Sequence, residues 1–198
     1  MANLQTRVVN ILKSPKSEWP VIAAESTDIG RLYSGYIIPL AAIPAVCGFI
    51  GMMWFTSAMT TAGLASRSLM WTLSWAIGGY VLGLVGTYIA AVVIEWLAPK
   101  FKSSGSRVDA LKVVAYSFTP VWIAGILQLV PLLGLLSIFA AIYAIYLCYL
   151  GLPHVMKTPQ DQVVIFMIVS AVVIVVIQMV LGGILGAILL GGAMTTVG

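Results

Sequence analysis

Residues 113–153 read VVAYSFTPVWIAGILQLVPLLGLLSIFAAIYAIYLCYLGLP, and this stretch decides the fold. Its 41 residues lie between Lys112 and His154 and include no charged side chain. A helix needs about 20 apolar residues to cross a bilayer, so the stretch suits two crossings joined by a tight turn. The turn signal is Gln128-Leu129-Val130-Pro131. We therefore predict transmembrane helices at residues 113–130 and 132–152.

Three further uncharged runs flank this stretch, at residues 32–66, 68–94 and 162–198. They predict transmembrane helices at residues 33–55, 69–97 and 163–190. The last run is long for one crossing, so its helix either tilts or breaks near Gly182-Gly183. The predicted fold is all-α: a cytoplasmic amphipathic segment at residues 1–31, followed by a five-helix transmembrane domain at residues 32–198.

The composition of the 198-residue chain is typical of a membrane protein. Hydrophobic residues make up 61% of the chain and charged residues 8%, and the mean hydropathy is +1.08. A soluble globular protein carries roughly 25% charged residues. A soluble chain of this size also has too little interior to hide so many apolar side chains. A bilayer removes that requirement.

Lysine and arginine side chains gather on one side of the predicted topology. Of the ten in the chain, only Arg67 lies on the other side. Loops rich in lysine and arginine stay in the cytoplasm. The distribution therefore predicts a cytoplasmic N-terminus and a C-terminus on the opposite side of the membrane, and it supports an odd number of helices.

The N-terminal segment carries charges throughout and is not expected to cross the membrane. Four apolar side chains share one face of a helix: Leu4, Val8, Ile11 and Leu12. Arg7 and Lys13 lie off that face, and Ser14-Pro15 marks the start of a second helix. We expect two short helices lying on the cytoplasmic membrane face. The alternative is a flexible tail with one helical turn.

Small residues recur at four-residue spacing within two predicted helices, as Gly79 and Gly83 and as Gly182 and Gly186. Such spacing lets helix backbones approach closely in lipid. We expect ordinary packing within the bundle, with a homo-oligomer interface as the alternative. Prolines inside predicted helices are expected to kink them; these are Pro39, Pro44 and Pro120.

Few ionisable side chains lie near the apolar runs. Glu95 ends the second predicted helix, where we expect an interfacial carboxylate close to Lys100 and Lys102. The alternative is a carboxylate that binds a proton or a substrate. His154 is the lone histidine and has no Cys, Asp or Glu at ligand spacing, so we expect an interfacial side chain and not a metal ligand.

Tyrosines recur every three residues in the fourth predicted helix, at Tyr143, Tyr146 and Tyr149. A tyrosine hydroxyl in lipid needs a hydrogen-bond partner. The preceding helix offers candidate partners in Tyr116, Ser117 and Thr119. These side chains either pack across the two helices or line a polar seam.

No pattern in the sequence supports catalysis or cofactor binding. A P-loop and a dinucleotide fingerprint are both absent. Ion-coupled transport usually needs ionisable groups near the bilayer midplane, and the apolar runs supply none. We expect a non-enzymatic protein with no cofactor, no metal site and no nucleic-acid partner.

Several stretches of the chain resemble a known family. They read AYSFTPVW at residues 115–122, VP at 130–131 and YAIYLCYLGLPHVMKTP at 143–159, together with Pro15, Trp19, Ile22 and Glu25. They are similar to the bacterial branch of the Yip domain family, named for Ypt/Rab-interacting membrane proteins. The resemblance covers nearly the whole chain. It implies five transmembrane helices in a bacterial inner membrane, with a cytoplasmic N-terminus and a periplasmic C-terminus.

The resemblance implies less about function. Eukaryotic members of the family are tied to vesicle traffic and Rab GTPases, but their cytoplasmic segment is longer than the one here. We do not expect a Rab-type GTPase partner. We predict a scaffold or adaptor that organises the membrane.

The family motifs single out seven residues as structurally or functionally important: Trp19, Tyr116, Ser117, Pro120, Gly151, Pro153 and Pro159. Pro120 is expected to kink the third helix, and Gly151-Leu152-Pro153 to end the fourth. The basic loop after the second helix is expected to contact anionic lipid headgroups, through Lys100, Lys102, Arg107 and Lys112.

Two other functions remain open. One is a small-molecule channel or transporter with a polar cavity, lined by Glu95, Tyr116, Ser117, Tyr143 and Tyr146. The other is a subunit of a larger membrane complex that assembles through the small-residue stripes.

Overall fold

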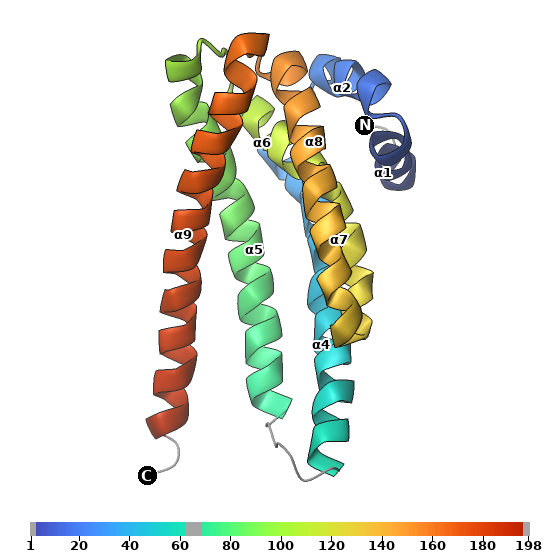
Figure 1. Cartoon of the computed structure of the whole chain (residues 1–198), viewed down its shortest axis with the longest axis vertical. Coiled ribbons are helices and arrows are strands. Elements are labelled where there is room, and N and C mark those ends of the chain that lie inside the picture. Colours follow the sequence, from blue (N-terminus) through green and yellow to red (C-terminus); the bar gives the residue numbers. More distant parts are fainter. Residues whose placement is uncertain (1–2, 62–68, 196–198) are drawn as a thin grey trace.

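The computed structural model describes residues 3–61 and 69–195. Within them, five helical segments are long and apolar enough to cross a membrane: Ile29–Ala58, Leu69–Phe101, Arg107–Leu129, Leu132–Val155 and Gln160–Ile184. The prediction of an all-α, five-helix membrane protein is confirmed. Figure 1 shows the long helices side by side, with the two short first helices at one end of the bundle, which we call the N-terminal end.

Two short helices precede the first crossing, as predicted. They are α1 (Leu4–Lys13) and α2 (Pro15–Ala24), and Asn3 caps α1 by accepting a hydrogen bond from the Gln5 backbone. A proline suits the first turn of α2 because that turn has no carbonyl partner for its N–H. Arg7, which was expected to lie off the apolar face of α1, is nevertheless buried, since the residue is only 4% exposed.

The first crossing begins at Ile29, four residues before the predicted start. It consists of α3 (Ile29–Leu32), a π-helical turn η1 (Tyr33–Ile37) and α4 (Ile38–Thr61). Asp28 caps α3 by accepting the Arg31 N–H at 2.9 Å. The π turn lies just before Pro39, whose ring and missing N–H disfavour a regular α-helical turn.

The second crossing, α5 (Leu69–Leu97), has the predicted bounds and continues into a 3₁₀ turn, η2 (Ala98–Phe101). The third begins with α6 (Arg107–Ser117), six residues before the predicted start. A capping box explains the early start, because Ser106 and Asp109 satisfy each other's backbone N–H groups. Lys112 therefore lies inside a helix and not in a loop.

The third crossing is broken and not merely kinked. After α6 the chain forms α7 (Thr119–Ala124), with Pro120 in its first turn, and then a 3₁₀ segment η3 (Gly125–Leu129). A second 3₁₀ segment, η4 (Pro131–Leu136), leads into α8 (Ser137–Val155). In Figure 1 this hairpin turns before it reaches the level where α4 and α5 end.

The fourth crossing does not end at Gly151-Leu152-Pro153, so that prediction is wrong. Helix α8 continues to Val155, with Pro153 inside its last turn. The carbonyl of Leu152 then accepts hydrogen bonds from the backbone of Met156 at 2.9 Å and of Thr158 at 3.4 Å. These bonds close the helix beyond the proline.

The fifth crossing, α9 (Gln160–Thr195), is continuous through Gly182-Gly183. The expected packing of small residues within the bundle is wrong for four glycines, because a methyl group built on each meets no neighbouring side chain or helix of the described residues within 4 Å; these are Gly79, Gly83, Gly182 and Gly186. Close helix contact occurs elsewhere. A methyl group on Gly125 would lie 2.6 Å from the Cβ of Pro44, where η3 crosses α4.

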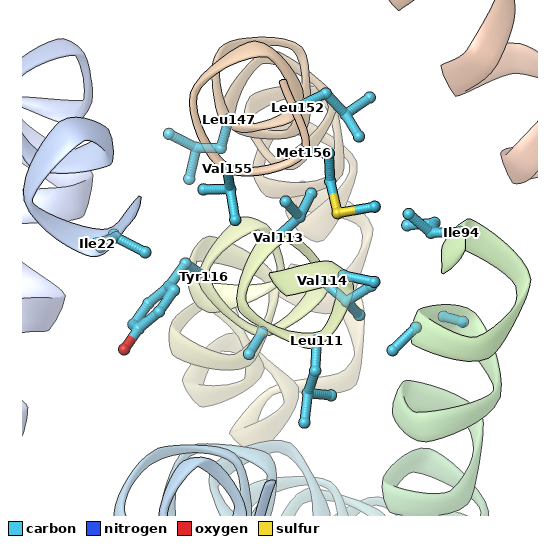
Figure 2. Packing of buried hydrophobic residues seen from close by; sticks show 14 of the residues in the cluster. Ile22, Ile94, Leu111, Val113, Val114, Tyr116, Leu147, Leu152, Val155 and Met156 are labelled. Carbon is cyan, nitrogen blue, oxygen red and sulfur yellow. The ribbon is translucent and has the colours of Figure 1, made fainter. Parts of the chain in front are cut away.

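The buried core lies toward the N-terminal end, around α6. Every residue from Ala110 to Ser117 is buried, and Figure 2 shows Val113, Val114 and Leu111 pointing toward the helices around them. Farther along the bundle the apolar side chains face outward. Leu132 is 76% exposed and Leu135 is 73% exposed, as expected for surfaces that meet lipid.

Candidate functional site

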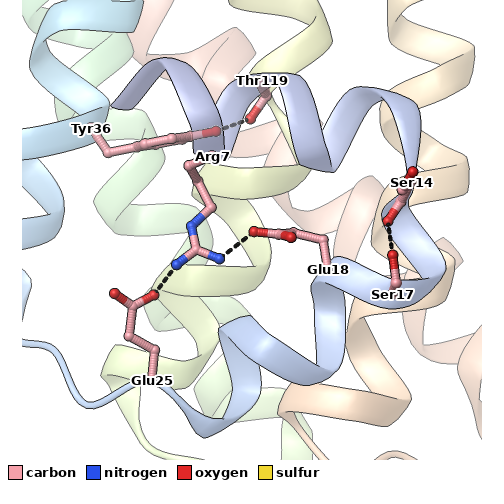
Figure 3. A network of polar contacts seen from close by, with 7 residues as sticks. All are labelled: Arg7, Ser14, Ser17, Glu18, Glu25, Tyr36 and Thr119. Atoms are coloured by element: carbon pink, nitrogen blue, oxygen red, sulfur yellow. Dashed lines mark hydrogen bonds and ion pairs between the residues drawn. The ribbon is translucent and has the colours of Figure 1, made fainter. Parts of the chain in front are cut away.

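A buried arginine joins the two N-terminal helices. The Arg7 guanidinium donates to Glu18 Oε1 at 2.5 Å and to Glu25 Oε2, and the Arg7 side chain is 5% exposed. Figure 3 shows the guanidinium lying between the two carboxylates. A buried charge is tolerated only when it is paired and hydrogen-bonded. The position of α1 against α2 is therefore fixed by these two ion pairs.

Lys112 extends this network to the transmembrane bundle. Its Nζ donates to the backbone carbonyl of Glu25 at 2.7 Å and lies 3.5 Å from Asp109. Glu25 caps the C-terminus of α2, where a cation is favoured because the last carbonyls carry partial negative charge. We call Arg7, Glu18, Glu25 and Lys112 the N-terminal clamp. The prediction that Lys112 contacts lipid headgroups is wrong, since the residue is 4% exposed.

Trp19 is the apolar counterpart of the clamp. It is fully buried, and its ring lies so close to α8 that a methyl group on Gly151 would be 2.7 Å from two indole carbons. The same indole meets Tyr116 edge-on, with ring centroids 6.3 Å apart. The family-motif residues Trp19, Tyr116 and Gly151 therefore come together at one contact between α2, α6 and α8.

An aromatic and hydroxyl contact lies beside the clamp. The rings of Tyr36 and Tyr116 are 4.6 Å apart, and the Arg7 guanidinium lies 5.7 Å from the centre of the Tyr116 ring. Tyr36 Oη and Thr119 Oγ1 share a hydrogen bond of 2.6 Å between buried atoms, also drawn in Figure 3. The break in the third crossing thus places Thr119 where it can join the first crossing.

Glu95 lies in an exposed ion pair at the same end of the bundle. Its carboxylate accepts a 2.6 Å hydrogen bond from Arg107 Nε, and Arg107 Nη1 lies 3.2 Å from Tyr88 Oη. The Glu95 side chain is 31% exposed. The ion-pair partner of Glu95 is thus Arg107 and not Lys100 or Lys102, the neighbours expected from the sequence, and the pair ties α5 to the start of α6.

The polar side chains proposed to line a cavity do not face one another. Tyr143 Oη donates to the backbone carbonyl of Leu12 in α1 at 2.8 Å, and not to α6 or α7 as predicted. Tyr146 is 39% exposed, Glu95 pairs with Arg107, and Tyr116 lies against Trp19. Of the proposed set, only Ser117 lines the cavity of about 290 Å³ between α5, α6, α7, α8 and α9, whose walls are otherwise almost entirely apolar.

The remaining motif residues shape the backbone. Pro120 is buried in the first turn of α7. Pro159 precedes α9, and its carbonyl accepts the Gln162 N–H at 2.9 Å.

His154 is exposed and its Nδ1 lies 2.7 Å from the Leu150 carbonyl. In residues 3–61 and 69–195, no group of three or more His, Cys, Asp and Glu side chains is placed to hold a metal ion.

The clamp was not predicted from the sequence, because Arg7 was expected off the apolar face of its helix and neither Glu18 nor Glu25 was assigned a partner. One signal was available. Glu18 and Glu25 are seven residues apart, which is two helical turns, so both fall on one face of α2 and its cap. A single cation on the neighbouring helix can then meet both carboxylates.

Comparisons with known proteins agree with this architecture. The family model described as the Yip1 domain matches residues 9–182. The inner membrane protein YohC of Escherichia coli K12 is 26% identical over 160 residues, which are 79% of this chain and 82% of that protein. The same protein from E. coli O6:H1 strain CFT073 matches equally well.

No solved structure matches the chain. The Yip1 match runs from α1 into α9 and so includes Trp19, Tyr116 and Gly151, four whole crossings and most of the fifth. This multi-pass membrane protein therefore belongs to the Yip1 domain family.

Proposed function

We propose that the protein is a non-enzymatic scaffold that organises the inner membrane, with the N-terminal end of the bundle in the cytoplasm. The observation that carries the proposal is the N-terminal clamp. It fixes α1 and α2 as a rigid extension of the bundle, because releasing Arg7 would break two buried ion pairs at once, one with Glu18 and one with Glu25.

The rigid extension leaves apolar side chains free to meet the membrane. Val9 of α1 is 46% exposed and Val21 of α2 is 53% exposed, while Ile11, Trp19 and Ile22 are fully buried against the protein. The other exposed side chains of the two helices include Gln5, Thr6, Lys13, Lys16 and Ser17, so the outer face is amphipathic. Amphipathic helices with lysines among their polar residues lie at the headgroup boundary. The scaffold thus adds fixed volume to one leaflet, which is a means of shaping a bilayer.

The inner-membrane location rests on the printed name of the E. coli relative. The orientation rests on the lysines and arginines. Nine of the ten belong to the segments at the N-terminal end, and loops rich in these residues stay in the cytoplasm. A transport function has less support, because the polar side chains that would line its pathway pair elsewhere.

Reconstitution into vesicles tests the proposal. Purified wild-type protein at increasing protein-to-lipid ratio is expected to change the distribution of vesicle diameters seen by electron cryomicroscopy. The double substitution Glu18→Gln and Glu25→Gln removes both carboxylate charges from Arg7 and should weaken the effect. Glu95→Gln is the matched control, since it breaks an ion pair outside the clamp. Unchanged vesicle shape at high wild-type density would refute the scaffold.

A second candidate, a subunit of a larger assembly, is favoured by one observation. The glycines Gly182, Gly183 and Gly186 of α9 meet no atom of the described chain at the position of a side chain, and small residues often mark helix contacts in membranes. Native mass measurement of the protein in mild detergent separates a monomer from a homo-oligomer. Substituting Gly182 and Gly186 by Leu should abolish an oligomer that uses this face.

A further inference from the structure

We propose that Lys100, Lys102 and Lys157 form a binding site for the phosphate of an anionic phospholipid headgroup at the N-terminal end of the bundle. The site goes beyond the scaffold function and does not depend on it. It is built from two loops that are far apart in the sequence, the loop that leads into α6 and the loop between α8 and α9.

Pairing of charges within the protein singles out these lysines. Five of the six carboxylates are held by a cation of the same chain: Glu18 and Glu25 by Arg7, Asp28 by Arg31, Glu95 by Arg107 and Asp109 by Lys112. Within the described part of the chain, the arginines and Lys112 are therefore occupied. The exposed cations without an ion pair there are Lys13, Lys16, Lys100, Lys102 and Lys157.

Two direct contacts bring the loops together. The Ser104 N–H donates to the Met156 carbonyl at 2.9 Å, and Ser103 Oγ donates to Thr158 Oγ1 at 2.9 Å. Lys102 immediately precedes Ser103 and Ser104 in the first loop. Lys157 lies between their partners, Met156 and Thr158, in the second loop. The backbones that carry these two lysines are thus fixed beside each other, although 55 residues separate Ser103 from Thr158.

The backbone conformation of both lysines is unusual. Lys102 has φ 54° and Lys157 has φ 53°, and no other non-glycine residue among the described ones has a positive φ. This left-handed region favours glycine, because a side chain crowds the backbone there. Lys102 is the C-cap of η2, where its N–H bonds to the Ala98 and Pro99 carbonyls, and Lys157 follows the C-cap of α8. Helix ends often adopt this conformation, usually with a glycine. Both positions carry a lysine instead, and neither lysine forms an ion pair in the described part of the chain.

The surroundings indicate a lipid headgroup as the occupant. The Lys100 ammonium lies 3.9 Å from the centre of the Trp96 ring, and Trp96 is 62% exposed. Exposed tryptophans at the ends of membrane helices lie at headgroup level. Asp161 lies in the first turn of α9, four residues after Lys157, so three lysines and one aspartate leave two positive charges. A zwitterionic headgroup brings its own cation, whereas an anionic headgroup complements the site.

Native mass spectrometry of the full-length protein with added lipid tests the site. Phosphatidylglycerol is expected to bind more tightly than phosphatidylcholine. The triple variant Lys100→Gln, Lys102→Gln and Lys157→Gln should lose most of that preference, at about fivefold per near-surface lysine. The matched control is the variant Lys13→Gln and Lys16→Gln, which removes two unpaired cations from α1 and α2. An equal loss in the control would show diffuse charge attraction and overturn the proposal, as would unchanged preference in the triple variant.

A second variant separates binding from folding. Lys102→Gly and Lys157→Gly together remove two charges but relieve the left-handed backbone. This protein is expected to melt at the same or a higher temperature while its preference for phosphatidylglycerol falls. A lower melting temperature together with unchanged preference would assign both lysines a structural role instead. Inorganic phosphate at the concentration of the lipid should not displace phosphatidylglycerol; equal displacement would make free phosphate the ligand and refute the lipid site.

Discussion

The indole ring of Trp19 lies against the backbone of Gly151, so closely that the glycine leaves no room for a methyl group. Trp19 belongs to α2 and Gly151 to α8. Their contact joins the N-terminal segment to a transmembrane helix more than 130 residues later in the chain. A helix-interior glycine lowers helix stability, and here that loss is offset by the burial of a complete tryptophan side chain.

Gly151→Ala tests this contact. The added methyl group would lie 2.7 Å from the ring, and overpacking of this kind costs about 1–3 kcal/mol. We expect a lower melting temperature in detergent, although alanine favours the helix itself. Trp19→Phe in the same protein removes the indole carbons nearest to Gly151 and should restore part of the loss. Additive effects of the two substitutions would show that the residues do not touch.

Arg7→Ala should be among the most damaging single substitutions in the N-terminal segment. It removes the cation that Glu18 and Glu25 share, and removing one partner of a buried ion pair costs about 3–5 kcal/mol. Limited proteolysis should cleave the variant between α1 and α2 at protease levels that the wild type resists. Arg31→Ala is the control, because the Arg31–Asp28 pair is 73% and 60% exposed and such pairs contribute about 0–1 kcal/mol. Equal protease resistance of Arg7→Ala and wild type would contradict a structural clamp.

Tyr36→Phe removes one buried hydroxyl from the hydrogen bond with Thr119. The expected loss is about 0.5–1.5 kcal/mol, because Thr119 Oγ1 still lies 3.4 Å from the Ala115 carbonyl and keeps a partner. A double-mutant cycle with Thr119→Val, followed by thermal melting, measures the coupling. A coupling energy near zero would mean that the hydroxyls of Tyr36 and Thr119 do not form a hydrogen bond in the folded protein.

Glu95→Gln distinguishes an interfacial ion pair from a functional carboxylate. Its partner Arg107 is 44% exposed in its side chain, and surface pairs contribute about 0.2–1 kcal/mol. We therefore expect nearly unchanged insertion and melting temperature. A large loss of stability would indicate that the pair is shielded from solvent far more than its exposed fraction suggests.

A reporter fused after Gly198 tests the orientation. Five crossings with a cytoplasmic N-terminus place this fusion in the periplasm, so alkaline phosphatase should be active and a fluorescent protein that needs the cytoplasm should be dark. The same reporters fused before α1 serve as the opposite control. Cytoplasmic activity at the C-terminus would contradict either the orientation or the number of crossings.

The five crossings follow from the sequence because charge and length suffice to find them. Residues 69–97 form a helix with the predicted bounds. Other helices begin earlier than predicted. The third crossing, for example, starts at Arg107 and not at residue 113, because the Ser106–Asp109 capping box begins the helix there. Prediction failed most clearly for Arg7 and Lys112. Arg7 is buried against Glu18 and Glu25, and Lys112 against the backbone of Glu25. No periodicity in one segment can show which charges another segment will cover.

The motif residues were identified from the sequence without their geometry. Trp19, Tyr116 and Gly151 were singled out by resemblance, but the contact of an indole with a glycine depends on how α2 lies across α8. Tyr36 and Thr119 depend on the break in the third crossing. Such pairings arise only when helices distant in the chain are brought together.

The π turn at Tyr33–Ile37 determines how the preceding N-terminal segment is rotated about the helix axis relative to α4. A wider turn holds more residues than a regular one, so Tyr33 donates to the Leu84 carbonyl of α5 while Tyr36 meets Thr119 of α7. Deleting one residue between these tyrosines would leave a helix that still crosses the bilayer, yet would swing one hydroxyl away by roughly 100°. The chain would still insert into the membrane, but the N-terminal helices would no longer be aligned with the bundle, and the contact of Trp19 with Gly151 would be lost.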